Sequence, residues 1–273
     1  MEVHVQFMLK KWVLLSLVAI IFSQSVDAMS SNIYKVPLHI IIPAYNEEHR
    51  IGPTLTSYCD YFKDFNIHLT VVLNGITDNT QSVVEGVQSL YPNKITILES
   101  DKGKGSAIKA GFLNSLNTNA DFIGFVDADG SISPNEYYNL FMTLLTEAWE
   151  YDGVIASRYM EGSDIGAPRP FIKEYGRKLV YNRRIEDQLG LSFKDYQCGA
   201  KLFKRKVIEN IAPLITESGW AIDLDILYLC KQFGFRVKEI PITWRDQEGS
   251  HLDILGSGND LYKAVDRIKK KRV

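Results

Sequence analysis

The sequence has few cysteines and no excess of positive charge. Its three cysteines, Cys59, Cys198 and Cys230, lie far apart among 273 residues. An odd number at this spacing predicts neither a disulfide framework nor a CxxC metal motif. Lysine and arginine total 31 against 33 acidic residues, which gives a formal net charge of -2. Because nucleic-acid-binding domains are usually strongly basic, we expect no nucleic acid among the partners.

The sequence also lacks a hydrophobic run of the usual membrane-spanning length. The apolar run Trp12–Phe22 has 11 residues, whereas a helix that spans a bilayer needs about 20. Two lysines precede this run and a small-residue cleavage pattern follows it, which is typical of a signal peptide at residues 1–28. An uncleaved membrane anchor and a true start at Met29 are the alternatives. In each case the folded domain is expected to begin near Val36.

From Val36 onward, the hydrophobic pattern alternates between strands and helices. Strands are predicted at 36–43, 67–73, 95–98 and 122–126, and helices at 51–65, 78–90, 106–116 and from Pro134. This alternation predicts an α/β fold, a Rossmann-like and mostly parallel sheet with helices on both faces. Beyond Tyr159 the pattern is less regular, with helices expected at about 171–189, 223–233 and 259–271 and a strand at 235–241.

Two carboxylates follow the fourth predicted strand directly, at Asp127 and Asp129. Sheets of this kind bind ligands at the carboxyl ends of their strands, which brings this loop close to the loops at 43–50 and 74–80. Residues i and i+2 of an extended segment point the same way, so both carboxylates can face one Mg²⁺ or Mn²⁺ ion. Ser131 is a weaker candidate ligand. The alternative is that one aspartate is only a turn residue.

Six motifs in order give the chain a family resemblance: "IIPAYNEEHRI", "DKGKGSAIKAGF", "FVDADGSISP", "VIASRY", "DYQCGAKLFKR" and "GWAIDLDILYL". Together they resemble glycosyltransferase family 2, in its dolichyl- or polyprenyl-phosphate sugar transferase branch. The resemblance covers about 36–251. It implies a GT-A fold, a UDP- or GDP-hexose donor, a Mg²⁺ or Mn²⁺ cofactor and a lipid phosphate acceptor at a membrane surface.

The resemblance also assigns donor-side residues. Asp127 and Asp129 correspond to the metal-binding DxD motif. Asn74 stands where the family usually has an aspartate, which leaves the nucleobase open, although an amide can both donate and accept a hydrogen bond. The residues that it implies for nucleotide-sugar binding are Pro43, Ala44, Tyr45, Glu47, Asn74, Asp78, Lys104, Asp127 and Ala128.

On the acceptor side, a basic stretch between residues 169 and 184 suits a phosphate group, or it is simply a solvated helix face. The resemblance implies that the acceptor phosphate is bound by Arg158, Arg177, Asn182 and Gln197. It makes Asp223 and Arg158 the catalytic candidates. Asp223 would act as a base only if the acceptor were a hydroxyl, because a phosphate is already ionised. The alternative for Asp223 is an N-cap of the helix that ends at Gly234.

The expected reaction is therefore an inverting attack by a phosphate oxygen on the anomeric carbon of a hexose. Transfer to a saccharide or other hydroxyl, and a non-catalytic module on a degenerate fold, remain the alternatives. The expected parts are a donor half at about 36–160, an acceptor half at about 160–251 and a basic C-terminal helix at 252–273. That helix either lies on an anionic membrane or packs on the domain.

The expected location is the cytoplasmic face of a membrane, because nucleotide sugars are made in the cytoplasm. Export is the alternative if residues 1–28 are a cleaved signal peptide.

Overall fold

The computed structural model describes residues 33–166, 181–247 and 254–271. Within these ranges, no helix combines the length and the apolar character needed to cross a membrane. The predicted signal or anchor segment at residues 1–28 lies outside the described residues.

The chain divides into two compact units. One contains residues 1–36 and 64–66, and the other contains residues 37–63 and 67–273. The sheet and the helices described below belong to the second unit. The division into donor half, acceptor half and C-terminal helix stays a prediction.

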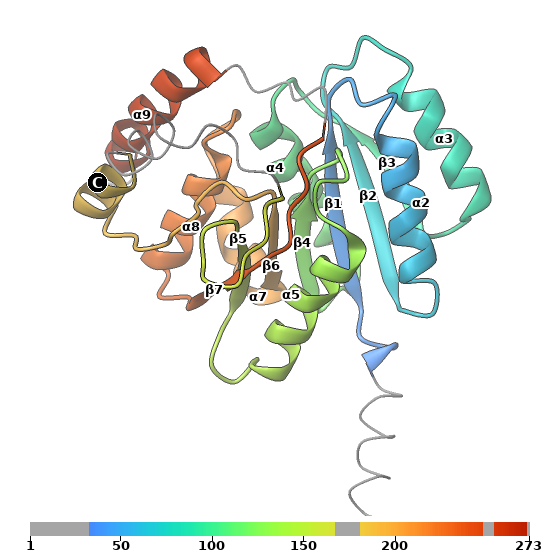
Figure 1. The fold of residues 1–273 in the computed structure, drawn as a ribbon, viewed down its shortest axis with the longest axis horizontal. Helices are drawn as coiled ribbons and strands as arrows, with labels where there is room; N and C mark the ends of the chain where they lie inside the picture. The colour runs from blue at the N-terminus through green and yellow to red at the C-terminus, as the bar shows by residue number, and fades with distance from the viewer. Residues whose placement is uncertain (1–32, 167–180, 248–253, 272–273) are drawn as a thin grey trace, which may run out of the picture. The chain divides into compact units, whose positions relative to one another are not determined.

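The core of the second unit is a seven-stranded sheet in the order β3-β2-β1-β4-β6-β5-β7 (Figure 1). Neighbouring strands run parallel except at β6, which is antiparallel to both β4 and β5. The mostly parallel α/β sheet predicted from the sequence is thus confirmed. The elements are β1 (Leu38–Ala44), α2 (Ile51–Tyr61), β2 (Ile67–Leu73), α3 (Thr80–Leu90), β3 (Ile95–Glu99), α4 (Lys104–Ser115), β4 (Phe122–Val126), α5 (Pro134–Thr146), β5 (Gly153–Ser157), β6 (Ala200–Lys204), α7 (Arg205–Ile211), a 3-10 turn (Ala212–Leu214), α8 (Ile222–Gln232), β7 (Val237–Pro241) and α9 (Ile254–Lys270).

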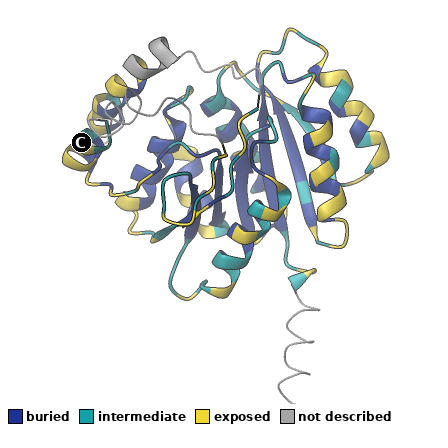
Figure 2. Ribbon diagram, viewed as in Figure 1, coloured by how far each residue is buried: buried dark blue, intermediate teal, exposed yellow. Residues whose placement is uncertain are grey.

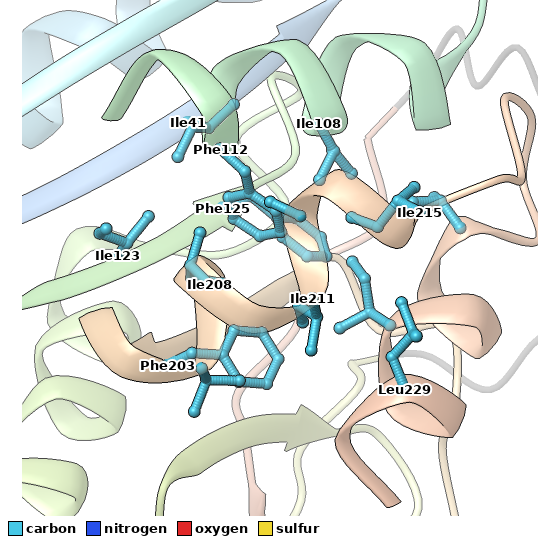
Figure 3. Close-up of a cluster of buried hydrophobic side chains, with 14 of the residues drawn as sticks. Ile41, Ile108, Phe112, Ile123, Phe125, Phe203, Ile208, Ile211, Ile215 and Leu229 are labelled. Atoms are coloured by element: carbon cyan, nitrogen blue, oxygen red, sulfur yellow. The ribbon is translucent and has the colours of Figure 1, made fainter. Parts of the chain in front are cut away.

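Helices cover both faces of the sheet, and β4 shows how alternate residues face each layer. The Phe122 ring packs edge-on against Phe141 of α5 on one face. Ile123 and Phe125 join the opposite cluster, which is formed with α4, α7 and α8 (Figure 3). The inner strands are almost entirely buried, whereas the edge strands β3 and β7 are mostly half-buried. Exposed residues gather on the outer helix faces (Figure 2). An apolar run such as β4 therefore needs no polar face.

The sequence predicts a capping box of Ser133 and Glu136 for one helix, and a cap at Thr77 or Asp78 for another. At α5, the Ser133 side chain accepts a hydrogen bond from the backbone N–H of Glu136, with proline in the first turn, which confirms the capping box. At α3, neither Thr77 nor Asp78 is the N-cap. The helix begins at Thr80, its N-cap is Asn79, and no side-chain bond caps it there.

The C-terminal helix α9 packs on the domain. Its buried residues Leu261, Val265 and Ile268 join a cluster with residues of α8 and β5. Tyr262, expected on the same apolar side, is instead 43% exposed. Because this apolar stripe is already covered by protein, it is not free to enter a membrane.

Candidate active site

The loops that follow β1 and β2 are joined by side-chain hydrogen bonds. Asn46, at a positive φ of 54°, exchanges hydrogen bonds with Thr77, and its amide oxygen accepts from the Thr77 N–H at 2.7 Å. The Asp78 carboxylate accepts from the backbone N–H of Glu48 at 3.1 Å and of Thr80 at 3.0 Å. Burial acts to raise the pKa of Asp78, but the Thr80 hydroxyl, which donates at 2.6 Å, and these two N–H groups together lower that pKa below its usual value. Both carboxylate oxygens of Asp78 therefore take part in hydrogen bonds, and the bond from Glu48 joins the two loops.

Asn74 joins three elements at this edge of the sheet. Its side-chain amide donates to the carbonyl of Ala44 at 2.9 Å, and its oxygen accepts from the N–H of Gly103 at 3.3 Å. Gly103 directly precedes α4, so Asn74 ties the ends of β1 and β2 to the helix that begins with Lys104. The residue that departs from the family pattern therefore has a structural role.

Asp127 and Lys104 form the centre of the candidate site. Asp127 continues the alternation of Ile123 and Phe125, so it points to the side of the sheet where α4 lies. Its Oδ1 is 2.7 Å from Lys104 Nζ. A Cβ at Gly199 would lie 1.9 Å from Asp127 Oδ2, so only glycine fits beside the carboxylate. The backbone N–H of Asp127 donates to the Gly199 carbonyl at 2.9 Å.

Positive and negative groups alternate behind this pair. Lys104 Nζ is 3.9 Å from Asp223 Oδ2, and Asp223 Oδ1 is 2.6 Å from Lys201 Nζ. The Lys201 side chain is fully buried and also donates to the Cys198 carbonyl at 2.8 Å. Buried charges are tolerated only when they are paired in this way.

The alternating charges of Asp127, Lys104, Asp223 and Lys201 shift the pKa values of Lys104 and Asp127. Burial acts to lower the pKa of Lys104, but Asp127 and Asp223 outweigh it and raise that pKa. Burial raises the pKa of Asp127, and the neighbouring Asp129 adds to this, while Lys104 opposes both effects. Lys104 is therefore a permanent cation at the point where an anionic ligand would meet the two aspartates.

Asp223 does not cap its helix. The N-cap of α8 is Ala221, and Asp223 lies in the first turn, where it pairs with Lys201 and faces Lys104. The expectation of an N-cap is therefore wrong, because tertiary ion pairs occupy both carboxylate oxygens.

The two DxD carboxylates suit a small hard cation. Asp129 Oδ1 accepts from the backbone N–H of Ser131 at 2.9 Å, which orients the carboxylate. Among the described residues, no group of three or more His, Cys, Asp or Glu side chains could enclose a metal. Two carboxylates fit Mg²⁺ or Mn²⁺, which protein sites commonly bind with one or two carboxylates plus substrate phosphates. Metal binding by Asp127 and Asp129, and by Ser131, stays a prediction.

The other donor-side candidates surround this centre. Pro43 and Ala44 are buried at the end of β1, and Ala128 is buried between the two aspartates. Tyr45 accepts a hydrogen bond from Lys102 at 3.0 Å. Glu47 forms two 2.7 Å hydrogen bonds with Arg50. Nucleotide binding by these residues stays a prediction.

Arg158, on the acceptor side, is held by an aspartate that the sequence did not single out. Its Nε and Nη2 donate to the two oxygens of Asp195 at 2.7 and 3.0 Å. Burial acts to lower the pKa of Arg158, but the buried Asp195 carboxylate raises it well above its ordinary value. The guanidinium group of Arg158 is therefore fixed in orientation and positively charged. Its Nη1 atom takes no part in the pairing with Asp195.

The remaining acceptor candidates are partly described. The backbone N–H of Gln197 donates to Asp195 at 3.1 Å, and the Asn182 amide donates to the Lys194 carbonyl at 3.3 Å. Arg177 lies outside the described residues. Phosphate binding by these residues stays a prediction.

Lys201 and Asp195 were missed as site residues, although both lie in the quoted motif "DYQCGAKLFKR". A lysine inside an otherwise apolar strand segment was the available signal for Lys201, because lysine is almost never fully buried without a partner.

Known proteins resemble this chain over most of its sequence. Residues 39–212 match the family model for glycosyl transferase family 2. Dolichyl-phosphate beta-glucosyltransferase from Drosophila melanogaster is 31% identical over 82% of this chain and 73% of its own length. The enzyme of the same name from Dictyostelium discoideum is 28% identical over 87% of this chain and 74% of its own.

A solved structure supports the fold. Glucosyl-3-phosphoglycerate synthase from Mycobacterium tuberculosis, crystallised with Mn²⁺ and UDP, matches with a TM-score of 0.64 at 17% identity, over 86% of this chain and 80% of that one. This likeness supports the GT-A arrangement expected from the sequence. The chain belongs to glycosyltransferase family 2 and is a glycosyltransferase, similar to the branch that glycosylates dolichyl and polyprenyl phosphates.

Proposed function

We propose that this enzyme transfers glucose from UDP-glucose to dolichyl phosphate, with inversion at the anomeric carbon and with Mg²⁺ or Mn²⁺ bound at Asp127 and Asp129. The observation that carries the proposal is Lys104, a cation whose side chain is 9% exposed and lies 2.7 Å from Asp127 at the carboxyl end of the sheet. An ammonium beside a metal-binding carboxylate suits a diphosphate leaving group. Relatives named dolichyl-phosphate beta-glucosyltransferase support the sugar and the acceptor.

The bound metal would supply positive charge that offsets the charge on the departing nucleoside diphosphate. Lys104 would contact the same diphosphate through its ammonium group, from the first turn of α4. Asp223 would keep Lys104 charged and in place. Arg158, whose guanidinium group is oriented by two hydrogen bonds to Asp195, would donate its remaining N–H groups to the acceptor phosphate.

The environment of Asp223 favours a phosphate acceptor over a hydroxyl. Both of its oxygens face lysine ammonium groups, at 2.6 Å for Lys201 and 3.9 Å for Lys104. A general base must reach the proton that it removes, with a free carboxylate oxygen. A phosphate oxygen attacks without such help. The sugar needs its own comparison, because one relative, polyprenol monophosphomannose synthase of Mycolicibacterium smegmatis, is 27% identical to this chain. Mannose is therefore the sugar to test beside glucose.

We also propose that the active site faces the cytoplasm, at a membrane surface, because the donor is made there and a dolichyl chain stays in the bilayer. Export by a cleaved signal peptide would separate the enzyme from its donor. Protease protection of the full chain in sealed microsomes distinguishes the two: cleavage of the catalytic domain from outside supports the cytoplasmic site, and protection contradicts it.

The test of function is sugar transfer by the full chain. Radiolabelled UDP-glucose, UDP-galactose, GDP-glucose and GDP-mannose are each supplied with dolichyl phosphate and Mn²⁺. We expect lipid-linked label from UDP-glucose, and a loss of about a hundredfold or more in Asp129→Ala. Asp121→Ala is the matched control, because Asp121 is an exposed aspartate just before the opposite end of β4.

Label on a soluble hydroxyl acceptor, without lipid product, would contradict the proposed acceptor. Lipid product from GDP-mannose alone would contradict the proposed donor. Equal losses in the Asp129 and Asp121 variants would contradict the metal site.

A further inference from the structure

The helix that carries Lys104 is contacted by residues 216–218, which follow the part of the chain that matches the family model, residues 39–212. The segment 216–218 covers the first turn of α4. The carbonyl of Ser218 accepts from the backbone N–H groups of Gly105 at 2.8 Å and Ser106 at 3.1 Å. A Cβ at Gly105 would lie 2.1 Å from the Glu217 carbonyl oxygen, so helix and segment are in close contact. The turn that carries Lys104 therefore rests on this segment.

The segment is held in turn by an ion pair between the buried Glu217 and the partly exposed Arg267 of α9. The Glu217 side chain is 5% exposed, and its Oε2 is 2.7 Å from Arg267 Nη2. Arg267 Nε donates to Oε1 at 3.3 Å, and Lys271 Nζ lies 3.7 Å from the same atom. The backbone N–H groups of Thr216 and Glu217 donate to Asp225 Oδ2 at 2.7 and 3.1 Å. A carboxylate buried this deeply is costly unless it is paired, so Arg267 is what makes this conformation favourable.

A second ion pair attaches α9 without touching the segment. Arg184 Nη2 donates to both oxygens of Asp266 at 2.7 Å, and the guanidinium lies 4.1 Å from the centre of the Tyr262 ring. Both arginines are partly exposed and both anchor the same helix. Only Arg267 contacts the segment against α4, so Arg184 is a matched control.

We propose that Arg267 is a positioning residue for donor binding: by pairing with Glu217 it fixes segment 216–218 against the first turn of α4, and so holds Lys104 beside Asp127. Only the last step, from Lys104 to the donor's diphosphate, rests on the proposed function. The C-terminal helix is then part of the donor site rather than an appendage that follows it.

The first experiment measures backbone amide exchange at residues 103–107 in the full chain by mass spectrometry. We expect roughly tenfold faster exchange in Arg267→Ala, because an ordered turn that loses its support opens more often. Arg184→Ala should exchange there like the unmodified chain. Arg267→Lys, which keeps the charge, should recover most of the protection.

A double variant tests the route through Glu217. Glu217→Gln removes the buried charge at constant volume, so Glu217→Gln with Arg267→Ala should exchange more slowly at 103–107 than Arg267→Ala alone. It also supplies a folded variant if Arg267→Ala does not fold. Equal exchange in Arg267→Ala and Arg184→Ala, or no recovery in the double variant, would overturn the proposal.

The second experiment measures binding of UDP and of GDP, each with Mn²⁺, by calorimetry. For the nucleotide that binds, we expect the Kd to rise roughly five- to tenfold in Arg267→Ala and to change little in Arg184→Ala. In transfer assays the KM for the donor should rise while that for dolichyl phosphate stays constant. An unchanged Kd in Arg267→Ala would overturn the proposal. If the unmodified chain bound neither nucleotide, the proposed function would fail, and amide exchange would still decide whether Arg267 fixes the turn.

Discussion

Asn74 shows how one polar side chain can serve the backbone of three elements at once. It is 3% exposed, donates to the Ala44 carbonyl and accepts from the Gly103 N–H. An aspartate, usual at this position in the family that the sequence resembles, has no N–H and would place a negative charge against a carbonyl oxygen. The departure from the family pattern is therefore consistent with a local fold that needs an amide.

Replacing Asn74 with aspartate should destabilise the protein. We expect Asn74→Asp to lower the free energy of unfolding by about 1–3 kcal/mol, because the Ala44 carbonyl loses its donor and a carboxylate takes its place. Urea unfolding followed by circular dichroism measures this. Asn117→Asp, at an exposed position, is the control and should change stability little. If Asn74→Asp were as stable as the control variant, the structural role of Asn74 would be wrong.

At the scale of elements, the site depends on how closely α4 approaches its neighbours. Its first turn meets the backbone of residues 217 and 218, and its later residues Ile108 and Phe112 pack into the core against β4 (Figure 3). Lys109 Nζ adds a 2.8 Å hydrogen bond to the Ile215 carbonyl. These contacts fix α4 along its length. Because Lys104 belongs to its first turn, the position of Lys104 is fixed as well.

A methyl group at Gly105 should disturb this approach. The Cβ would lie 2.1 Å from a backbone oxygen, and backbone cannot move aside as a flexible side chain can. We expect Gly105→Ala to cost about 1–3 kcal/mol of stability and to lower sugar transfer at the same time.

The control is Gly86→Ala in α3, where nothing lies within 4 Å of the added Cβ. There alanine should be neutral, or should stabilise by up to about 1 kcal/mol through its helix propensity. Thermal unfolding and the transfer assay read out both variants. Similar behaviour of the two alanine variants would argue against close packing at Gly105.

For the molecule as a whole, a buried histidine links stability to pH. His39 on β1 is 1% exposed, and its Nε2 lies 2.7 Å from Thr70 Oγ1. Burial, with a smaller effect of His68, lowers the pKa of His39 to about 3. In the unfolded chain His39 would have the ordinary histidine pKa of 6.5. Between these pH values the unfolded chain binds one more proton, so the folded state loses stability as pH falls from 6.5.

The expected slope is about 1.4 kcal/mol per pH unit from this one group. His39→Gln should remove that part of the slope between pH 6 and pH 4, measured by urea unfolding at several pH values. His49→Gln is the control, because the His49 side chain is 89% exposed. An unchanged slope in His39→Gln would mean that His39 is protonated in the folded protein.

Local patterns in the sequence were enough for the sheet as far as β4 and for the start of α5. They were not enough for β5, β6 and α7, which the sequence analysis left unassigned. "AKLFK" contains two lysines, and one of them, Lys201, is buried only because Asp223 meets it from α8. The two predicted caps differ from the structure for different reasons. Asp78 lies one residue before the N-cap Asn79, and its carboxylate accepts hydrogen bonds from both Thr80 and Glu48. Asp223 lies inside the first turn of α8 and pairs with lysines of other elements.

The sequence by itself predicted the parallel strands, and with them the edge of the sheet at which Asp127 and Asp129 lie, because hydrophobic period is a local property. Lys104 and Arg158 were predicted from the family resemblance. Only the tertiary structure decided which charges meet. The pairs Lys201 with Asp223, Arg158 with Asp195 and Arg267 with Glu217 join residues far apart in the chain. A buried charge needs a partner of opposite sign, but the place of β6 within the sheet and the packing of α8 and α9 select the partners.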